Sequence, residues 1–149
     1  MMRQEALSPF ISVPDTIGEL LLAVGASVPF GQEGKVHVWG RNDMATNQKL
    51  GIGWVVKDPD GIVAEDYSDW QTFSATPGGT HEFISPGRFD LNKTGTWTIS
   101  IALFMNPDAP VTVDTYEGVL CVVEEAIFAG TIIKKELEYD ETRGDIPVY

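Results

Sequence analysis

Only a few residues in this sequence have the type and spacing that metal or proton chemistry requires. His37 and His81 could meet across a sheet as metal ligands, but two scattered histidines are more often ordinary strand residues. Asp58 and Asp60 could offer carboxylate oxygens to Ca²⁺, which takes about six to eight oxygen ligands. They lie in the run Asp-Pro-Asp-Gly, which favours a tight turn over a calcium loop.

An acidic cluster formed by Glu65, Asp66 and Asp69 is the remaining candidate for acid–base chemistry, and it fits a solvated strand face better than a catalytic pair. The sequence contains no G-x-S-x-G, P-loop, H-E-x-x-H or C-x-x-C pattern. We therefore expect no catalytic residues, no metal site and no cofactor, and we do not expect an enzyme.

Trp39 and Trp70 are the best candidates for binding a partner. Trp39 follows Val36 and Val38 in an alternating run, so it points outward if the two valines face the core. An exposed tryptophan can stack on a sugar or anchor a protein partner. We favour cover by an arm or a neighbouring subunit, and leave sugar binding as the alternative.

Charge and cysteine content limit the class of partner. The net charge is −12 and the pI is about 4.3, which disfavours nucleic acid and anionic membranes because both carry negative charge. Cys121 is the only cysteine, so no disulfide can form within the chain. Residues 1–10 lack the charged and apolar regions of a signal peptide, and we expect no export signal there.

The elements that would position these residues are strands. Turn signals recur at short spacing, and the runs between them alternate in polarity or are rich in β-branched and aromatic residues. The expected strands lie at residues 35–41, 50–57, 62–70, 81–85, 88–91, 96–105 and 111–123. About seven strands in roughly 100 residues predict an all-β, immunoglobulin-like antiparallel β-sandwich over residues 26–125. Trp54, in the strand at residues 50–57, then takes the place of the core tryptophan on the third strand of that fold, and Ile99 stands where antibody domains have a cysteine.

Two extension arms are expected outside this sandwich. Residues 1–25 form an N-terminal arm with one short strand, and residues 126–149 form a C-terminal arm with one strand. The C-terminal arm is too apolar for a disordered tail. Together with the two tryptophans, its apolar residues are the expected partner-binding set: Ile133, Leu137, Tyr139, Ile146, Val148 and Tyr149.

Three runs carry a resemblance to a known family: residues 28–42, residues 53–61 (Gly-Trp-Val-Val through Asp-Pro-Asp-Gly) and residues 89–99, which include Gly-Thr-Trp-Thr-Ile. They resemble bacterial and viral immunoglobulin-like modules of the CARDB and adhesion type. Residues 130–147 are similar to segments of structural proteins of tailed bacteriophages. Such modules share a fold without sharing an active site.

The resemblance implies a non-enzymatic structural protein, such as a capsid decoration component of a phage virion. We expect it to assemble with itself, as a homo-oligomer, or with capsid or tail proteins, through terminal arms and sheet edges. The alternative is an adhesion or glycan-binding module at the cell surface.

Overall fold

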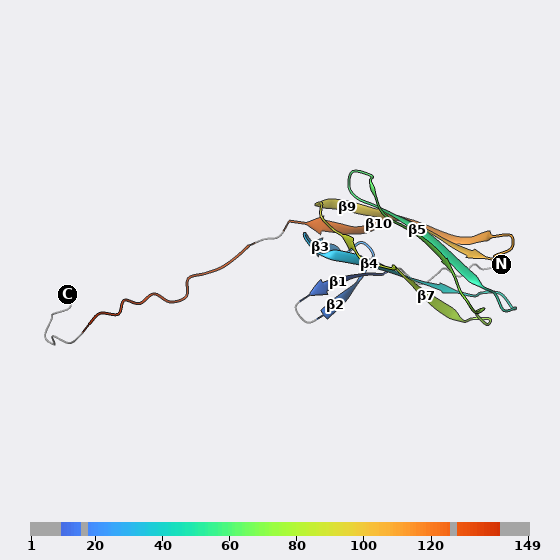
Figure 1. Cartoon of the computed structure of the whole chain (residues 1–149), viewed down its shortest axis with the longest axis horizontal. Helices are drawn as coiled ribbons and strands as arrows, with labels where there is room; N and C mark the ends of the chain where they lie inside the picture. The colour runs from blue at the N-terminus through green and yellow to red at the C-terminus, as the bar shows by residue number, and fades with distance from the viewer. Residues whose placement is uncertain (1–9, 16–17, 126–127, 141–149) are drawn as a thin grey trace.

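Two β-sheets pack face to face in a computed structural model that describes residues 10–15, 18–125 and 128–140 (Figure 1). The described residues form ten strands, and none of them is helical. The all-β sandwich that the sequence predicts is therefore confirmed. The strand number is higher than seven because short strands at residues 10–29 add to the sheets.

The first sheet consists of β1 (Phe10–Asp15), β2 (Gly18–Ala23), β4 (Glu33–Arg41), β7 (Thr80–Ile84) and β8 (Phe89–Asp90). The strand order is β2–β1–β4–β7, and β8 also pairs with β4. All of these neighbours are antiparallel.

The second sheet consists of β3 (Ser27–Pro29), β5 (Leu50–Lys57), β6 (Val63–Trp70), β9 (Gly95–Met105) and β10 (Val111–Glu124). The strand order is β3–β10–β9–β5–β6, and only β3 runs parallel to its neighbour. β3 is an edge strand of three residues, which suits Pro29 because proline has no N–H to donate to a ladder.

The core lies between the two sheets and follows the period-two pattern of the long strands. Val36 and Val38 of β4 are buried in the same core cluster as Trp54, and along β9 every second residue from Trp97 to Met105 is buried. Trp54 is 2% exposed, so its predicted place in the core is confirmed. Ile99 is also buried and fills the position of the absent cysteine.

The turn between β5 and β6 forms as its residues predict. Asp58 accepts hydrogen bonds from the backbone N–H groups of Asp60 and Ile62, both at 2.9 Å. Gly61 has a φ of 81°, in the left-handed region that residues with a Cβ rarely adopt.

The N-terminal segment differs from the expected arm, because its described part is built into the sandwich. β1 and β2 form a hairpin, β1 pairs with β4, and Ile11 and Val13 are buried in the core. Pro14 made this strand hard to predict from the sequence, because proline is uncommon within strands. It is compatible with the fold because only residues 10–12 of β1 pair with β4. Residue 25 is therefore not a boundary between an arm and the sandwich.

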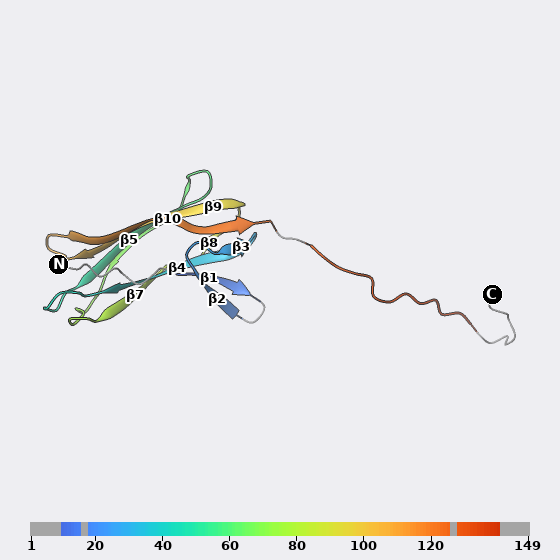
Figure 2. The ribbon, with the colours of Figure 1, turned by 180° about the vertical axis from the view of Figure 1, so that it is seen from behind.

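The C-terminal segment, defined here as residues 128–140, runs away from the sandwich in an extended course (Figures 1 and 2). The strand expected between residues 126 and 149 does not form in the described part of this range. A strand needs a ladder partner for its backbone groups, and this segment lies beyond the sheets. Ile146, Val148 and Tyr149 lie outside the described residues.

Candidate functional site

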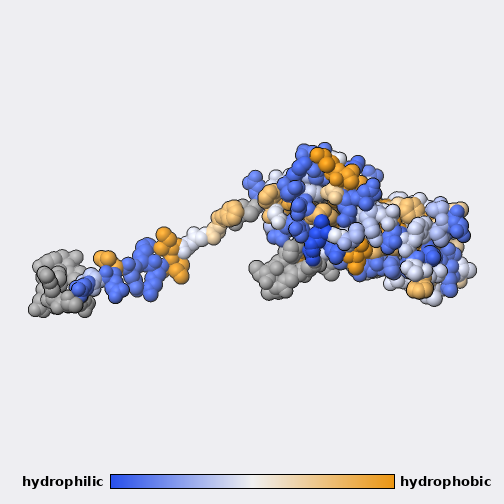
Figure 3. All heavy atoms as spheres, in the orientation of Figure 1, coloured by the Kyte–Doolittle hydropathy of each residue, from blue (hydrophilic) through white to orange (hydrophobic). Residues whose placement is uncertain are grey.

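The C-terminal segment presents apolar side chains to solvent. Ile133 is 92% exposed, Leu137 is 88% exposed and Phe128 is 94% exposed, and Figure 3 shows hydrophobic residues along this part of the chain. Side chains of this size are normally removed from water, and each is worth roughly 1.5–3 kcal/mol when fully buried. Burial of these side chains against another surface would therefore contribute a large favourable free energy.

The residues of the segment alternate as they do in a strand with one buried face. In an extended chain Ile133, Leu137 and Tyr139 share one side, which is apolar except for Lys135, while the other side carries Lys134, Glu136 and Glu138. Lys134 Nζ lies 3.2 Å from Glu136 Oε1, which is consistent with this side sharing. Both charged side chains are mostly exposed, so the ion pair itself contributes little to stability.

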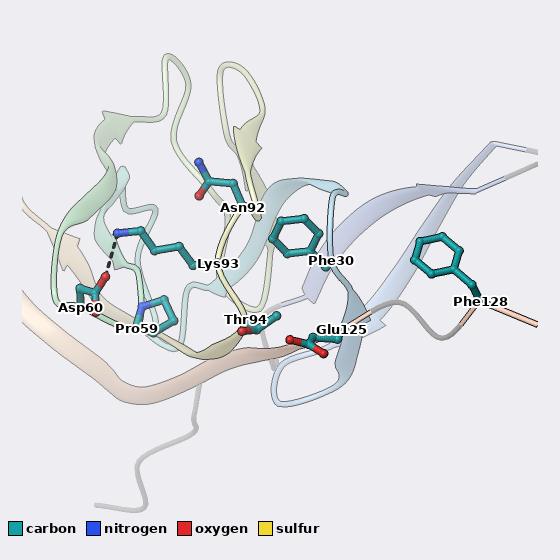
Figure 4. Close-up of a pocket in the computed structure, with 8 residues that line it drawn as sticks. All are labelled: Phe30, Pro59, Asp60, Asn92, Lys93, Thr94, Glu125 and Phe128. Carbon is teal, nitrogen blue, oxygen red and sulfur yellow. Dashed lines mark hydrogen bonds and ion pairs between the residues drawn. The ribbon is translucent and has the colours of Figure 1, made fainter.

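A hollow of about 650 Å³ lies where the segment leaves the sandwich (Figure 4). It is lined by Phe30, Pro59, Asp60, Asn92, Lys93, Thr94, Glu125 and Phe128. These residues come from the ends of β3 and β10 and from two loops, and Figure 4 shows Phe128 standing apart from the others. The hollow is mixed in polarity, with one lysine that is already paired to a carboxylate on its rim.

Lys93 occupies the position that a cation would take between Asp58 and Asp60. Its Nζ lies 2.6 Å from Asp58 Oδ2 and 3.0 Å from Asp60 Oδ2. The other oxygen of Asp58 accepts two backbone hydrogen bonds, so both of its oxygens are engaged within the protein. The ion pair between Lys93 and Asp58 joins the β5–β6 turn to the loop before β9. In the described residues no group of three or more His, Cys, Asp or Glu side chains could hold a metal.

The Asp58–Lys93 pair predicts a specific pH dependence of stability. The hydrogen bond from Lys93 lowers the pKa of Asp58, with desolvation opposing it. Because the pKa of Asp58 is lower in the folded protein than in the unfolded chain, its carboxylate stabilises the fold at pH values above the ordinary aspartate pKa. This contribution is lost as the pH falls through the lowered pKa. We expect Asp58→Asn to flatten the fall in stability below about pH 4. Urea denaturation across pH 2–7 measures this, with a substitution of the exposed Asp108, Asp108→Asn, as a control. An unchanged acid limb in Asp58→Asn would contradict the prediction.

The two histidines and the acidic cluster have structural contacts. His37 Nε2 lies 3.0 Å from Ser12 Oγ, and its Nδ1 lies 3.3 Å from Glu82 Oε2. His81 packs edge-on against Phe83. In the β4–β7 ladder His81 is the partner of Gly40, three residues from His37, so the two histidines are not ladder partners.

Glu65 of the acidic cluster connects the two sheets through hydrogen bonds. Its Oε1 accepts hydrogen bonds from Trp54 Nε1 at 2.7 Å and from Ser85 Oγ at 2.6 Å. Ser85 Oγ in turn accepts a hydrogen bond from the backbone N–H of Val36 at 2.8 Å. This series of hydrogen bonds satisfies the buried indole N–H of Trp54. The spacing of these residues in the sequence does not indicate that they meet.

Trp39 and Trp70 lie on different sheets and are not brought together. Trp39 is half-buried and meets the edge of Phe10 at a centroid distance of 5.3 Å, so the N-terminal hairpin covers part of it. Trp70 lies at the end of β6 against Gly51, with Phe104 at 6.3 Å. Partner contacts at both tryptophans stay predictions.

Phe104, which lies beside Trp70 on the outer face of the second sheet, is a candidate binding residue that could be singled out from the sequence but was not. Thr96, Thr98, Ser100 and Ala102 occupy the outer face of β9, and Phe104 ends that small and polar series with a large aromatic ring. That change of residue type was the available signal.

Cys121 is fully buried, and burial raises the pKa of its thiol to about 12. The thiol is therefore protonated at neutral pH and a poor nucleophile. The described residues contain no helix of the length and apolarity that a membrane crossing requires.

Comparisons with known proteins support the fold but do not assign the chain to a family. No family model and no curated protein matches the sequence. Among solved structures, Bacteroides uniformis beta-glucuronidase 2 superposes with a TM-score of 0.54 at 13% identity, over 75% of this chain and 12% of that chain. The C-terminal domain of wzt superposes with a TM-score of 0.50 at 12% identity, over 87% of this chain and 81% of that domain.

These likenesses agree with the immunoglobulin-like β-sandwich that the two sheets of this chain form. At identities of 12–13% they concern the fold alone. The chain spans only about an eighth of the glucuronidase chain that it matches.

Proposed function

We propose that this chain is a non-enzymatic structural module that assembles with other protein subunits through its C-terminal segment. The observation that carries the proposal is the exposure of Ile133 and Leu137 on one side of an extended segment that lies beyond the sheets. A segment that is apolar on one side and polar on the other has the pattern of a strand that adds to a sheet.

The acceptor that we propose is the free edge of β6 in another subunit. In the described part of the chain β6 pairs only with β5, so about every second one of its eight residues points its backbone N–H and C=O groups toward the free edge. Asp66 and Asp69 give this edge negative charge, and the C-terminal segment brings Lys134 and Lys135 beside three carboxylates of its own, those of Glu136, Glu138 and Asp140. Opposite charges fix the register of the added strand more than they add affinity.

A phage virion is the setting that we propose for this assembly. Its support is the resemblance of residues 130–147 to segments of tailed-phage structural proteins, and of the sandwich to CARDB and adhesion-type modules. Capsid, portal or tail genes beside this reading frame would support that setting. A sortase or polysaccharide-enzyme gene would support the cell-surface alternative.

The apolar side of the C-terminal segment is testable with matched substitutions. We expect the full chain to show concentration-dependent assembly in sedimentation velocity, and the double variant Ile133→Ser, Leu137→Ser to abolish it. Its melting should stay unchanged, because both side chains are exposed in the single chain.

The control is Lys134→Ser, Glu136→Ser, which alters the opposite side of the same segment and should leave assembly largely intact. Equal assembly by the apolar-side variant and the full chain would contradict the proposal, as would a monomeric full chain at every concentration.

A further inference from the structure

A trough crosses the outer face of the second sheet, at right angles to its strands. Its floor is one row of ladder partners that are all small: Ser68 of β6, Gly53 of β5, Ala102 of β9 and Thr115 of β10. Three strand spacings make the row about 14 Å long. A hollow of about 510 Å³ lies over these residues.

Aromatic rings lie on one side of the trough: Phe104 lines the hollow, and Trp70 stands next to Phe104, outside the lining residues. In the next row of the ladder, Trp70 pairs with Gly51 and Gly51 pairs with Phe104. A Cβ at Gly51 would lie 2.6 Å from atoms of the Trp70 ring, so the indole rests against the glycine backbone. Trp70 and Phe104 are tilted by 36° to each other, and both remain partly exposed.

Polar groups border the trough on its other side. There the ladder row runs from Asp66 of β6 through Val55 of β5 and Ser100 of β9 to Glu117 of β10. The carboxylates of Asp66 and Glu117 and the hydroxyl of Ser100 are exposed. The trough therefore has an aromatic border and a border of hydrogen-bond acceptors, with a floor low enough to admit a flat ligand between them.

We propose that this trough binds a neutral oligosaccharide. A pyranose ring presents C–H groups on its face, which pack on aromatic rings, and hydroxyl groups at its edge, which donate to carboxylates. A neutral sugar fits better than an acidic one because Asp66, Glu117 and a net charge of −12 repel an anionic ligand. This inference is independent of the proposed assembly.

An added protein strand fits the trough less well than a sugar. The trough lies over β5 and β9, whose backbone groups are already paired with neighbours on both sides. A peptide laid across them would lack the ladder hydrogen bonds that a sheet edge supplies. Hydroxyl groups of a sugar need only the side-chain acceptors that the border provides.

The test is isothermal titration of the full chain with a panel of neutral hexasaccharides: cellohexaose, xylohexaose, maltohexaose, mannohexaose and chitohexaose. We expect at least one to bind, and we expect Trp70→Ala and Phe104→Ala each to weaken it about tenfold or more. Gly51→Ala should also weaken binding, because its Cβ displaces the indole ring while keeping it in the protein. Trp39→Ala, which removes a tryptophan from the other sheet, should leave affinity unchanged.

Thermal melts of each variant ensure that a loss of binding reflects the trough and not unfolding. Failure of all five hexasaccharides at millimolar concentration would overturn the inference. So would undiminished affinity in Trp70→Ala and Phe104→Ala, or tighter binding of oligogalacturonate. If a synthetic peptide of residues 128–149 instead binds the trough, with its affinity lost in Phe104→Ala, the trough receives the C-terminal segment and not a sugar.

Discussion

Replacing Trp54 by alanine should lower the free energy of unfolding by about 3–5 kcal/mol. The indole is 2% exposed and packs at 4.8 Å, centroid to centroid, against Tyr67. Alanine would leave a cavity between the two sheets that close-packed neighbours fill only in part. It would also remove the N–H that Glu65 accepts at 2.7 Å, weakening the hydrogen-bonded link to Ser85 and the first sheet.

Urea denaturation measures this loss, and two further variants separate its parts. Trp54→Phe keeps one aromatic ring and removes the N–H together with part of the indole volume, so its loss should fall between zero and that of alanine. Trp39→Ala removes a half-buried tryptophan from a sheet surface and should cost less than Trp54→Ala. A loss below about 1 kcal/mol in Trp54→Ala would mean that the ring does not support the core.

The sandwich could be predicted from sequence because its strands obey local rules. Alternation along residues 96–105 determines which side chains of β9 face the core, and the Asp-Pro-Asp-Gly run determines where β5 turns into β6. Both signals lie within a dozen residues, so they need no knowledge of the partner strands. The burial of Trp54 and Ile99 follows from the same alternation.

Features that depend on pairing between distant residues could not be predicted in this way. Lys93 reaches Asp58 across 35 residues of sequence, and its presence turns an apparent cation site into an ion pair. The trough depends on the ladder register of four strands, which places Gly51 under Trp70 and beside Phe104. Pro14 made β1 hard to predict, because the strand tolerates proline beyond the residues that pair with β4, and composition cannot reveal where that pairing stops.

Deleting residues 129–149 should abolish assembly while the sandwich keeps its stability. The described part of this range contributes no strand to either sheet, and its side chains are exposed. The chain therefore loses few native contacts, and we expect the free energy of unfolding to change by no more than about 0.5 kcal/mol. Assembly should fail because the deletion removes every apolar side chain from Ile132 onward that could be buried against another subunit.

Folding back onto the same subunit is the competing fate of the C-terminal segment, since it costs only the entropy of loop closure. The two fates differ in their dependence on concentration. An exchanged segment gives oligomers that grow with protein concentration, whereas a segment folded back gives monomers whose stability depends on it.

Sedimentation velocity of the full chain and of the chain ending at residue 128, each followed by a urea melt, tests this account most directly. We predict that the full chain forms larger species as its concentration rises, and that the truncated chain remains monomeric with a cooperative melt and an unchanged midpoint. Oligomers of the same size in both chains, or a truncated monomer that unfolds, would contradict assembly through the C-terminal segment.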